Sequence, residues 1–182
     1  HEGTAPKALF ASAYPVAELI KVAPPLQFVY AQGEGVDYPE AIPFKTLYEG
    51  DLAPIAEELH PDVDDPLIYI FTSGTTGQPK GGMITHRNTW HISKNSAESW
   101  KFTNDDVVVC YMSTSHVADT HDSITLAIYA GAASVCMQGF DPDELMATME
   151  KYGVTYILTI PTVFRLLLLK VDFSKYDTTA MR

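Results

Sequence analysis

The second half of the chain alternates apolar runs with segments that carry helix signals. The runs VVVCYM at 107–112, ASVCMQ at 133–138 and VTYILTI at 154–160 are apolar, as strands buried in a sheet are. Helices are expected to follow these strands at 122–130, 142–152 and 162–170. A repeated strand–helix order requires crossover connections, which are right-handed. The pattern therefore predicts an α/β fold with a largely parallel sheet and flanking helices.

One of these helices has signals at both ends. Asp141 can cap its N-terminus, and Pro142 suits the first helical position. Lys151 lies in the last turn, where a positive charge is favourable, and Gly153 stands just past the end. The residues expected on its apolar face are Leu145, Met146 and Met149.

Residues 1–65 are predicted to be a partial α/β segment that ends in a connector. Its expected elements are a strand at 7–12, a helix at 15–23, a strand at 26–31 and a short extended piece at 43–49. The stretch 51–66 is acidic and interrupted by prolines, which is typical of a surface connector. Residues 66–182 follow as the core segment, and we expect the two segments to form one continuous, incomplete domain.

A polar loop carries the strongest functional signal. LIYIF at 67–71 is expected to be a buried strand and MITH at 83–86 a short strand, with a helix beginning near Asn88 as its N-cap. Between the two strands lies TSGTTGQPKG, residues 72–81. Its glycines let backbone amides approach a ligand, its hydroxyls donate hydrogen bonds, and Lys80 supplies a charge that can follow phosphate oxygens. The loop is predicted to bind phosphate groups.

The loop is not a P-loop of the form G-x-x-x-x-G-K-[ST]. Counted from Gly74, that pattern requires a glycine where this chain has Pro79, and a hydroxyl residue where it has Gly81. A P-loop also opens a helix, whereas this loop runs into an expected strand. We therefore expect its amides, hydroxyls and lysine, rather than a helix dipole, to attract the anion.

Residues 72–81, T-S-G-T-T-G-x-P-K-G, resemble the signature of the adenylate-forming (AMP-binding) superfamily. That superfamily includes acyl- and aryl-CoA synthetases, peptide-synthetase adenylation domains and beetle luciferases. DDVVVCYM, STSH, AIYAGAASVCM and FDPDELMATMEKYGVTYILTIPTVFRLLL then follow the order of elements in the family. The similarity covers 66–182 well and the first 65 residues more loosely. It implies the N-terminal domain of an acyl- or aryl-CoA synthetase.

The resemblance implies a two-step reaction. A carboxylate attacks the α-phosphate of ATP to give an acyl-adenylate and pyrophosphate, and the thiol of coenzyme A then takes the acyl group. The implied cofactors and partners are ATP, Mg²⁺ carried on ATP, coenzyme A and a small carboxylic acid, with a role in fatty acid metabolism. The residues implied to contact the β- and γ-phosphates are Thr72, Ser73, Gly74, Thr75, Thr76, Gly77 and Lys80. Lys80 is also an implied catalytic residue, because fixed donors stabilise charge that moves onto pyrophosphate.

His116 is the second implied catalytic residue. It stands where the family has a pocket histidine, and the resemblance implies that it lies near the acyl carboxylate. The residues before it usually include a proline and an aromatic, whereas this chain has Ser113, Thr114 and Ser115. The pocket wall is therefore expected to be more open or more polar. A strand-end histidine that only bonds to a backbone group is the alternative.

Two further patterns are not read as sites. HVADTHD at 116–122 has metal-ligand residue types, but His121 falls off the helical face that His116 and Asp119 would share, so a solvated, partly capping acidic turn is expected. YGVT at 152–155 imitates the family motif Y-G-x-T-E, but Tyr156 replaces the magnesium-binding glutamate. It also lies at an expected helix-to-strand junction.

Charge and cysteine content limit the remaining function classes. The net charge of -11 argues against non-specific nucleic-acid binding, because phosphate backbones would repel the chain. No apolar run approaches the roughly 18 residues of a membrane span, and no signal peptide is visible. Cys110 and Cys136 are expected to be buried small hydrophobes in a reduced cytoplasm, with a disulfide or a reactive thiol as the alternatives. The pattern does not indicate an oligomeric state.

The resemblance also implies that the sequence is an internal fragment. The family's magnesium glutamate, ribose-binding aspartate and C-terminal catalytic lysine have no counterpart in 1–182, so the fragment is expected to be inactive alone. The alternatives are a peptide-synthetase adenylation domain, a luciferase-like enzyme, or a nucleotide- or phosphate-binding module without catalysis.

Overall fold

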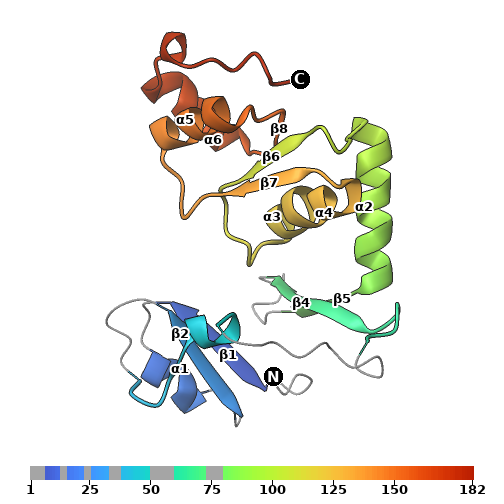
Figure 1. The fold of residues 1–182 in the computed structure, drawn as a ribbon, viewed down its shortest axis with the longest axis vertical. Helices are drawn as coiled ribbons and strands as arrows, with labels where there is room; N and C mark the ends of the chain where they lie inside the picture. The colour runs from blue at the N-terminus through green and yellow to red at the C-terminus, as the bar shows by residue number, and fades with distance from the viewer. Residues whose placement is uncertain (1–6, 13–15, 23–25, 33–37, 50–59, 73–79) are drawn as a thin grey trace. The chain divides into compact units, whose positions relative to one another are not determined.

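The computed structural model describes residues 7–12, 16–22, 26–32, 38–49, 60–72 and 80–182. The chain divides into two compact units, His1–His60 and Pro61–Arg182 (Figure 1). Within the described residues, no helix is both long enough and apolar enough to cross a membrane.

The first unit contains a small parallel sheet. Strands β1 (Ala8–Ser12), β2 (Phe28–Gln32) and β3 (Ile42–Pro43) lie side by side in that order, and α1 (Val16–Val22) joins the first two. Phe10 and Tyr30 occupy paired positions and their rings stack, with centroids 5.2 Å apart. The predicted strand–helix–strand order is confirmed.

The extended piece predicted at 43–49 is wrong. Residues Phe44–Leu47 form a 3₁₀ turn, η1, directly after β3. The Thr46 hydroxyl donates to the Pro43 carbonyl at 2.8 Å, and such local side-chain bonds favour a turn over a strand. The Phe44 ring also meets Phe10 edge-on, which holds the turn against the sheet.

The second unit opens with an antiparallel hairpin. Strand β4 (Pro66–Thr72) pairs with β5 (Lys80–Thr85), so the prediction that the polar loop joins two strands is confirmed. The prediction that LIYIF is buried is wrong. Leu67, Tyr69 and Phe71 occupy alternate positions of β4 and so lie on one face of the hairpin, and all three are exposed.

Helix α2 (His86–Trp100) follows the hairpin directly and begins earlier than predicted. Thr85, not Asn88, is the N-cap: its hydroxyl accepts from the Asn88 backbone N–H at 3.1 Å. The Asn88 side-chain oxygen accepts from the Thr85 N–H at 3.1 Å in return. The two residues form a reciprocal capping box, so Asn88 takes part in the cap from the third helical position.

The predicted parallel sheet is confirmed in the second half of the chain. Strands β6 (Val107–Cys110), β7 (Ala133–Cys136) and β8 (Tyr156–Ile157) are parallel, with β6 in the middle. The helices α5 (Pro142–Tyr152) and α6 (Pro161–Lys170) follow β7 and β8, and the short turn η4 (Phe173–Lys175) comes after them. Strand β8 is shorter than the run 154–160 suggested.

The helix predicted at 122–130 is one part of a longer segment. It consists of α3 (Val117–Asp119), a π-helical turn η3 (Thr120–Thr125) and α4 (Leu126–Ala130). The Thr125 hydroxyl donates to the His121 carbonyl at 3.1 Å within the π turn. Gly131 ends α4 with a φ of 71°, a conformation that glycine adopts without strain, as predicted.

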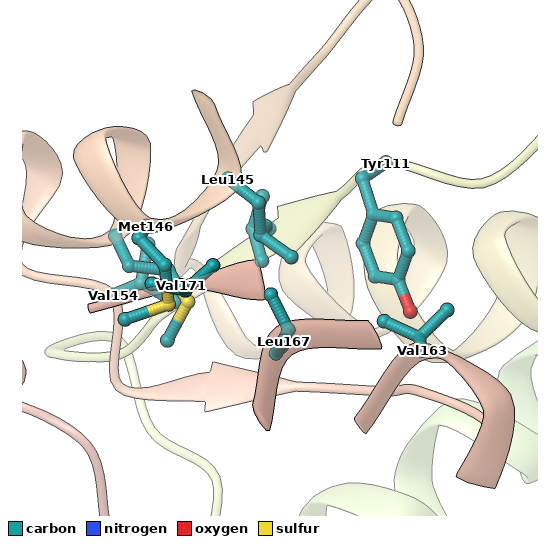
Figure 2. Close-up of a cluster of buried hydrophobic side chains, with 9 residues drawn as sticks. Tyr111, Leu145, Met146, Val154, Val163, Leu167 and Val171 are labelled. Atoms are coloured by element: carbon teal, nitrogen blue, oxygen red, sulfur yellow. The ribbon is translucent and has the colours of Figure 1, made fainter. Parts of the chain in front are cut away.

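Two apolar clusters cover the two faces of the β6–β7–β8 sheet. On one face Val109 and Tyr111 pack with α5 and α6, through Leu145, Met146, Met149, Val163 and Leu167 (Figure 2). On the other face Val108 packs with Ala97 of α2 and Leu126 of α4. The sheet is therefore buried between two helical layers, which fixes where its strand ends present side chains.

Candidate functional site

The two described ends of the predicted phosphate loop lie opposite each other. Thr72 is the last residue of β4 and pairs directly with Lys80, the first residue of β5. Side chains at such paired positions share a face, with Cβ atoms about 5 Å apart. Both residues are exposed. The remaining predicted phosphate contacts, Ser73, Gly74, Thr75, Thr76 and Gly77, lie outside the described residues.

Gly81 has a structural role that sequence reasoning missed. It pairs with Phe71, and a Cβ atom built on it would lie 3.2 Å from Phe71 Cε1. That separation is closer than most real Cβ contacts. The glycine after Lys80 thus leaves room for the Phe71 ring over β5.

The carboxyl ends of β6 and β8 form a topological switch point. The two strands are neighbours, but the helices that follow them cover opposite faces of the sheet. Helix α4, after β6, packs on the face of Val108, and α6, after β8, packs on the face of Val109. Ligands of α/β proteins bind outside the carboxyl ends of strands at such points. The Tyr111 hydroxyl donates to Thr159 Oγ1 at 2.6 Å and joins the segments that follow the two strands. Neither residue was predicted, because their meeting depends on strand order.

His116 lies in the segment that leaves this switch point. It is the N-cap of α3, and its Nδ1 accepts a hydrogen bond from the Ala118 N–H at 3.1 Å. The neutral imidazole therefore carries its proton on Nε2, so this nitrogen can donate to an oxygen of a ligand. The backbone contact that was the alternative reading of His116 is present, and it fixes the tautomer that a ligand would meet.

The turn before His116 is polar and exposed. The hydroxyls of Ser113 and Ser115 lie 2.6 Å apart, and the Thr120 hydroxyl donates to the Thr114 carbonyl at 2.6 Å. These contacts hold the turn without the proline and aromatic residue that were expected from the family pattern.

The prediction of a solvated acidic turn at 116–122 is wrong for two of its residues. Asp119 and His121 are buried. Asp119 accepts from Cys110 Sγ at 3.1 Å and from Ser123 Oγ at 3.3 Å. Both ring nitrogens of His121 are buried without a hydrogen-bond partner among the described residues. Asp119 is the last residue of α3, whereas His121 lies in the π turn, whose residues do not follow the regular helical repeat.

Burial shifts two pKa values in this turn. It lowers the pKa of His121, although the nearby Asp122 charge acts in the opposite direction. It raises the pKa of Asp122, which His121 partly offsets. Over the part of the chain that the structure describes, no three His, Cys, Asp or Glu side chains come together as a metal site would require.

The two cysteines differ in exposure. Cys110 is buried, as predicted, but Cys136 is exposed, which contradicts the prediction for that residue. Cys136 ends β7, which lies at the edge of the sheet that the described residues form. An apolar run cannot show whether its strand is central or at an edge.

Hydrogen bonds and ion pairs do not connect all the described residues that were predicted to form the site. No hydrogen bond or ion pair joins the described residues Lys80 and His116. The rejected YGVT motif begins at Tyr152, the last residue of α5, and continues through Gly153 toward β8. Its predicted place between a helix and a strand is confirmed.

Comparison with known proteins identifies relatives of the chain. A family model described as AMP-binding enzyme matches residues 3–182. A 4-coumarate–CoA ligase from Pinus taeda is 30% identical over 131 residues, covering 70% of this chain and 24% of that protein. A second, CCL1 from Humulus lupulus, is 28% identical over 148 residues, covering 79% and 27%. The chain thus spans about a quarter of the length of these relatives.

The fold is also found in solved structures. MatB from Rhodopseudomonas palustris, determined with ATP bound, superposes with a TM-score of 0.76 at 23% identity. The match covers 97% of this chain and 34% of that one. At this identity the likeness shows the fold, an α/β arrangement that the chain shares with part of a larger protein.

Proposed function

Because the chain belongs to the family of AMP-binding enzymes, we propose that its parent protein is an ATP-dependent carboxylate–CoA ligase. In this proposal a carboxylic acid and ATP give an acyl-adenylate and pyrophosphate, and coenzyme A then accepts the acyl group. The similarity to 4-coumarate–CoA ligases supports a thiol acceptor and a small organic acid.

The observation that carries this proposal is the pairing of Thr72 with Lys80 at the base of the loop. An exposed hydroxyl and an exposed ammonium share one face there, and residues 72–81 contain no acidic side chain. This donor set fits an anionic polyphosphate. Lys80 would hold the β- and γ-phosphate oxygens as a point charge, and Thr72 would donate a hydrogen bond.

Charge distribution explains why such a loop would accelerate the first step. Negative charge grows on the pyrophosphate group as its bond to the α-phosphate breaks. Donors that are already in place stabilise this charge more than they stabilise the bound substrate. Mg²⁺ bound to ATP would neutralise part of the same charge. Loop residues 73–78 would supply the remaining amides and hydroxyls.

His116 would orient the acid. Its Nε2–H is the free donor of the imidazole, since Nδ1 already accepts from Ala118. A carboxylate oxygen or the acyl-adenylate carbonyl is a suitable acceptor. The place of His116 beyond the carboxyl end of β6 supports this role, because the switch point between β6 and β8 is where α/β proteins bind ligands.

The test is carboxylate-dependent exchange of pyrophosphate into ATP by the whole protein. Lys80→Ala is expected to lower the exchange rate about 100-fold, the scale for losing one preorganised donor, with little change in the KM for the acid. Lys170→Ala removes another exposed lysine from the end of α6 and is expected to leave exchange unchanged. Unaltered exchange in Lys80→Ala would refute the role of Lys80.

A further inference from the structure

Two cysteines occupy the same register position on neighbouring strands. Cys110 is the last residue of β6 and Cys136 the last of β7, and the parallel ladder pairs them directly. Side chains at paired positions leave the sheet on one face, and neighbouring strands lie about 4.8 Å apart. A disulfide requires Cα atoms about 4.4–6.8 Å apart. The backbone therefore meets the first requirement for a disulfide between them.

The two thiols have different access to solvent. Cys136 is exposed, whereas only 2% of Cys110 is. A small molecule can reach Cys136 in the folded protein, but it cannot reach Cys110.

The buried thiol already has a proton acceptor. Cys110 Sγ donates to Asp119 Oδ2 at 3.1 Å, and Asp119 is fully buried. Burial raises the pKa of the Cys110 thiol, and Asp119 and the neighbouring Cys136 raise it further. Cys110 therefore stays protonated until its proton moves to an acceptor, and Asp119 is in place to take it. The backbone pairing of β6 with β7 places Cys136 directly beside Cys110.

We propose that Cys110 and Cys136 are a redox-active thiol pair that a small-molecule disulfide, such as oxidised glutathione, converts to an intramolecular disulfide. Cys136, deprotonated by solvent, attacks one sulfur of the oxidant. The oxidant's S–S bond breaks, one small thiol leaves, and a mixed disulfide forms on Cys136. Cys110 then passes its proton to Asp119 and attacks the Cys136 sulfur, and the second small thiol leaves. The protein loses two electrons and two protons, and the oxidant becomes two thiols.

Oxidation would alter the segment that holds His116. Asp119 lies in α3, the helix that His116 caps. When Cys110 forms the disulfide, it can no longer donate a hydrogen bond to Asp119. Asp119 then keeps the hydrogen bond from the Ser123 hydroxyl, which lies 3.3 Å from its Oδ1. The redox state of the two cysteines thus changes the hydrogen bonds of Asp119 in α3, next to His116. This proposal stands apart from the proposed function, because it concerns thiol chemistry that does not require ATP.

The experiment is intact-mass spectrometry, without reductant, of the 182-residue chain exposed to oxidised glutathione. The wild-type chain is expected to stay monomeric and to become about 2 Da lighter, because closing one disulfide removes two hydrogen atoms. Cys110→Ser is expected to stop at one glutathione adduct on Cys136, and Cys136→Ser to remain unmodified. A wild-type chain that also stops at one adduct, or that forms linked dimers, would overturn the proposal.

A second pair of variants tests the role of Asp119. Asp119→Asn removes the proton acceptor, so the glutathione adduct is expected to form at the normal rate and to close at least about tenfold more slowly. Ser123→Ala removes the other donor to Asp119 and is expected to close at the wild-type rate. Equal rates of disulfide closure in Asp119→Asn and Ser123→Ala would exclude Asp119 as the proton acceptor. Whether Cys110 and Cys136 form a disulfide at all is decided separately, by comparing the wild-type chain with Cys110→Ser.

Discussion

Arg182 Nη2 lies 2.5 Å from Asp106 Oδ2, although 76 residues separate them in the sequence. The buried Asp106 carboxylate also accepts from the Thr103 N–H and from the Thr155 hydroxyl, each at 2.7 Å. Arg182 donates in addition to the Lys101 carbonyl at 3.0 Å. This network ties the start of β6 to the segments before β8 and after α6, so it holds the sheet on which the candidate site is built.

Asp106→Asn is expected to destabilise the chain by about 2–3 kcal/mol, because it weakens hydrogen bonds to a buried charged group. Urea unfolding followed by circular dichroism measures this difference. Asp105→Asn is the matched control, since it changes the exposed neighbouring carboxylate. Equal midpoints for the two variants would show that the network contributes little.

The same carboxylate predicts a loss of stability in acid. Burial alone would raise the pKa of Asp106, but bonds from Thr155 and Thr103 and the charge of Arg182 bring it below its ordinary value of 3.8. A carboxylate with a lowered pKa stabilises the fold above pH 3.8, and that contribution disappears as the pH falls through the folded-state pKa. Unfolding curves measured below about pH 4 should show this loss in the wild type and not in Asp106→Asn. A parallel decline in both would contradict it.

His121 predicts a separate loss of stability at milder pH. Burial lowers its pKa below the ordinary 6.5, so protonation favours the unfolded chain. The neutral side chain is tolerated above pH 6.5, and stability falls as the pH decreases below that value toward the folded-state pKa. His121→Gln is expected to flatten the change in unfolding free energy between about pH 7 and pH 5.5, whereas His91→Gln, at an exposed position, is not. An unchanged slope in His121→Gln would count against the buried imidazole.

Replacing Gly153 at the end of α5 is expected to lower the free energy of unfolding. Its φ is 59°, and it closes the helix as the left-handed residue. Gly153→Ala places a Cβ in that conformation and should cost about 1–2 kcal/mol in urea unfolding. Gly139→Ala is the control, because a Cβ there has open space and its φ is not in the left-handed region. A Gly153→Ala chain as stable as Gly139→Ala would contradict the cap.

Local signals predicted the features that depend on local chemistry. Asp141 caps α5 by accepting from the N–H groups of Asp143 and Glu144, each at 3.0 Å, and Gly153 ends that helix, as the sequence indicated. The parallel direction of β6, β7 and β8 was predicted from the alternation of strands and helices along the chain. These features need only residues within about one element of each other.

Features set by distant residues could not be predicted. The exposure of Cys136 depends on β7 being an edge strand, and the Tyr111–Thr159 bond depends on β6 lying next to β8. His121 is buried in a π turn, where the backbone departs from the regular helical repeat. In each case the deciding partner is far away in the sequence or the backbone departs from its regular period.

The central claim is that the loop between Thr72 and Lys80 binds the pyrophosphate part of ATP. Isothermal titration of pyrophosphate into the 182-residue chain tests it most directly, with Lys80→Ala and Lys170→Ala measured under the same conditions. The account predicts saturable binding that Lys80→Ala weakens about tenfold or more, the scale of one charged hydrogen bond, and that Lys170→Ala leaves unchanged. Equal affinity in the wild type and Lys80→Ala, or no binding by the wild type, would contradict it.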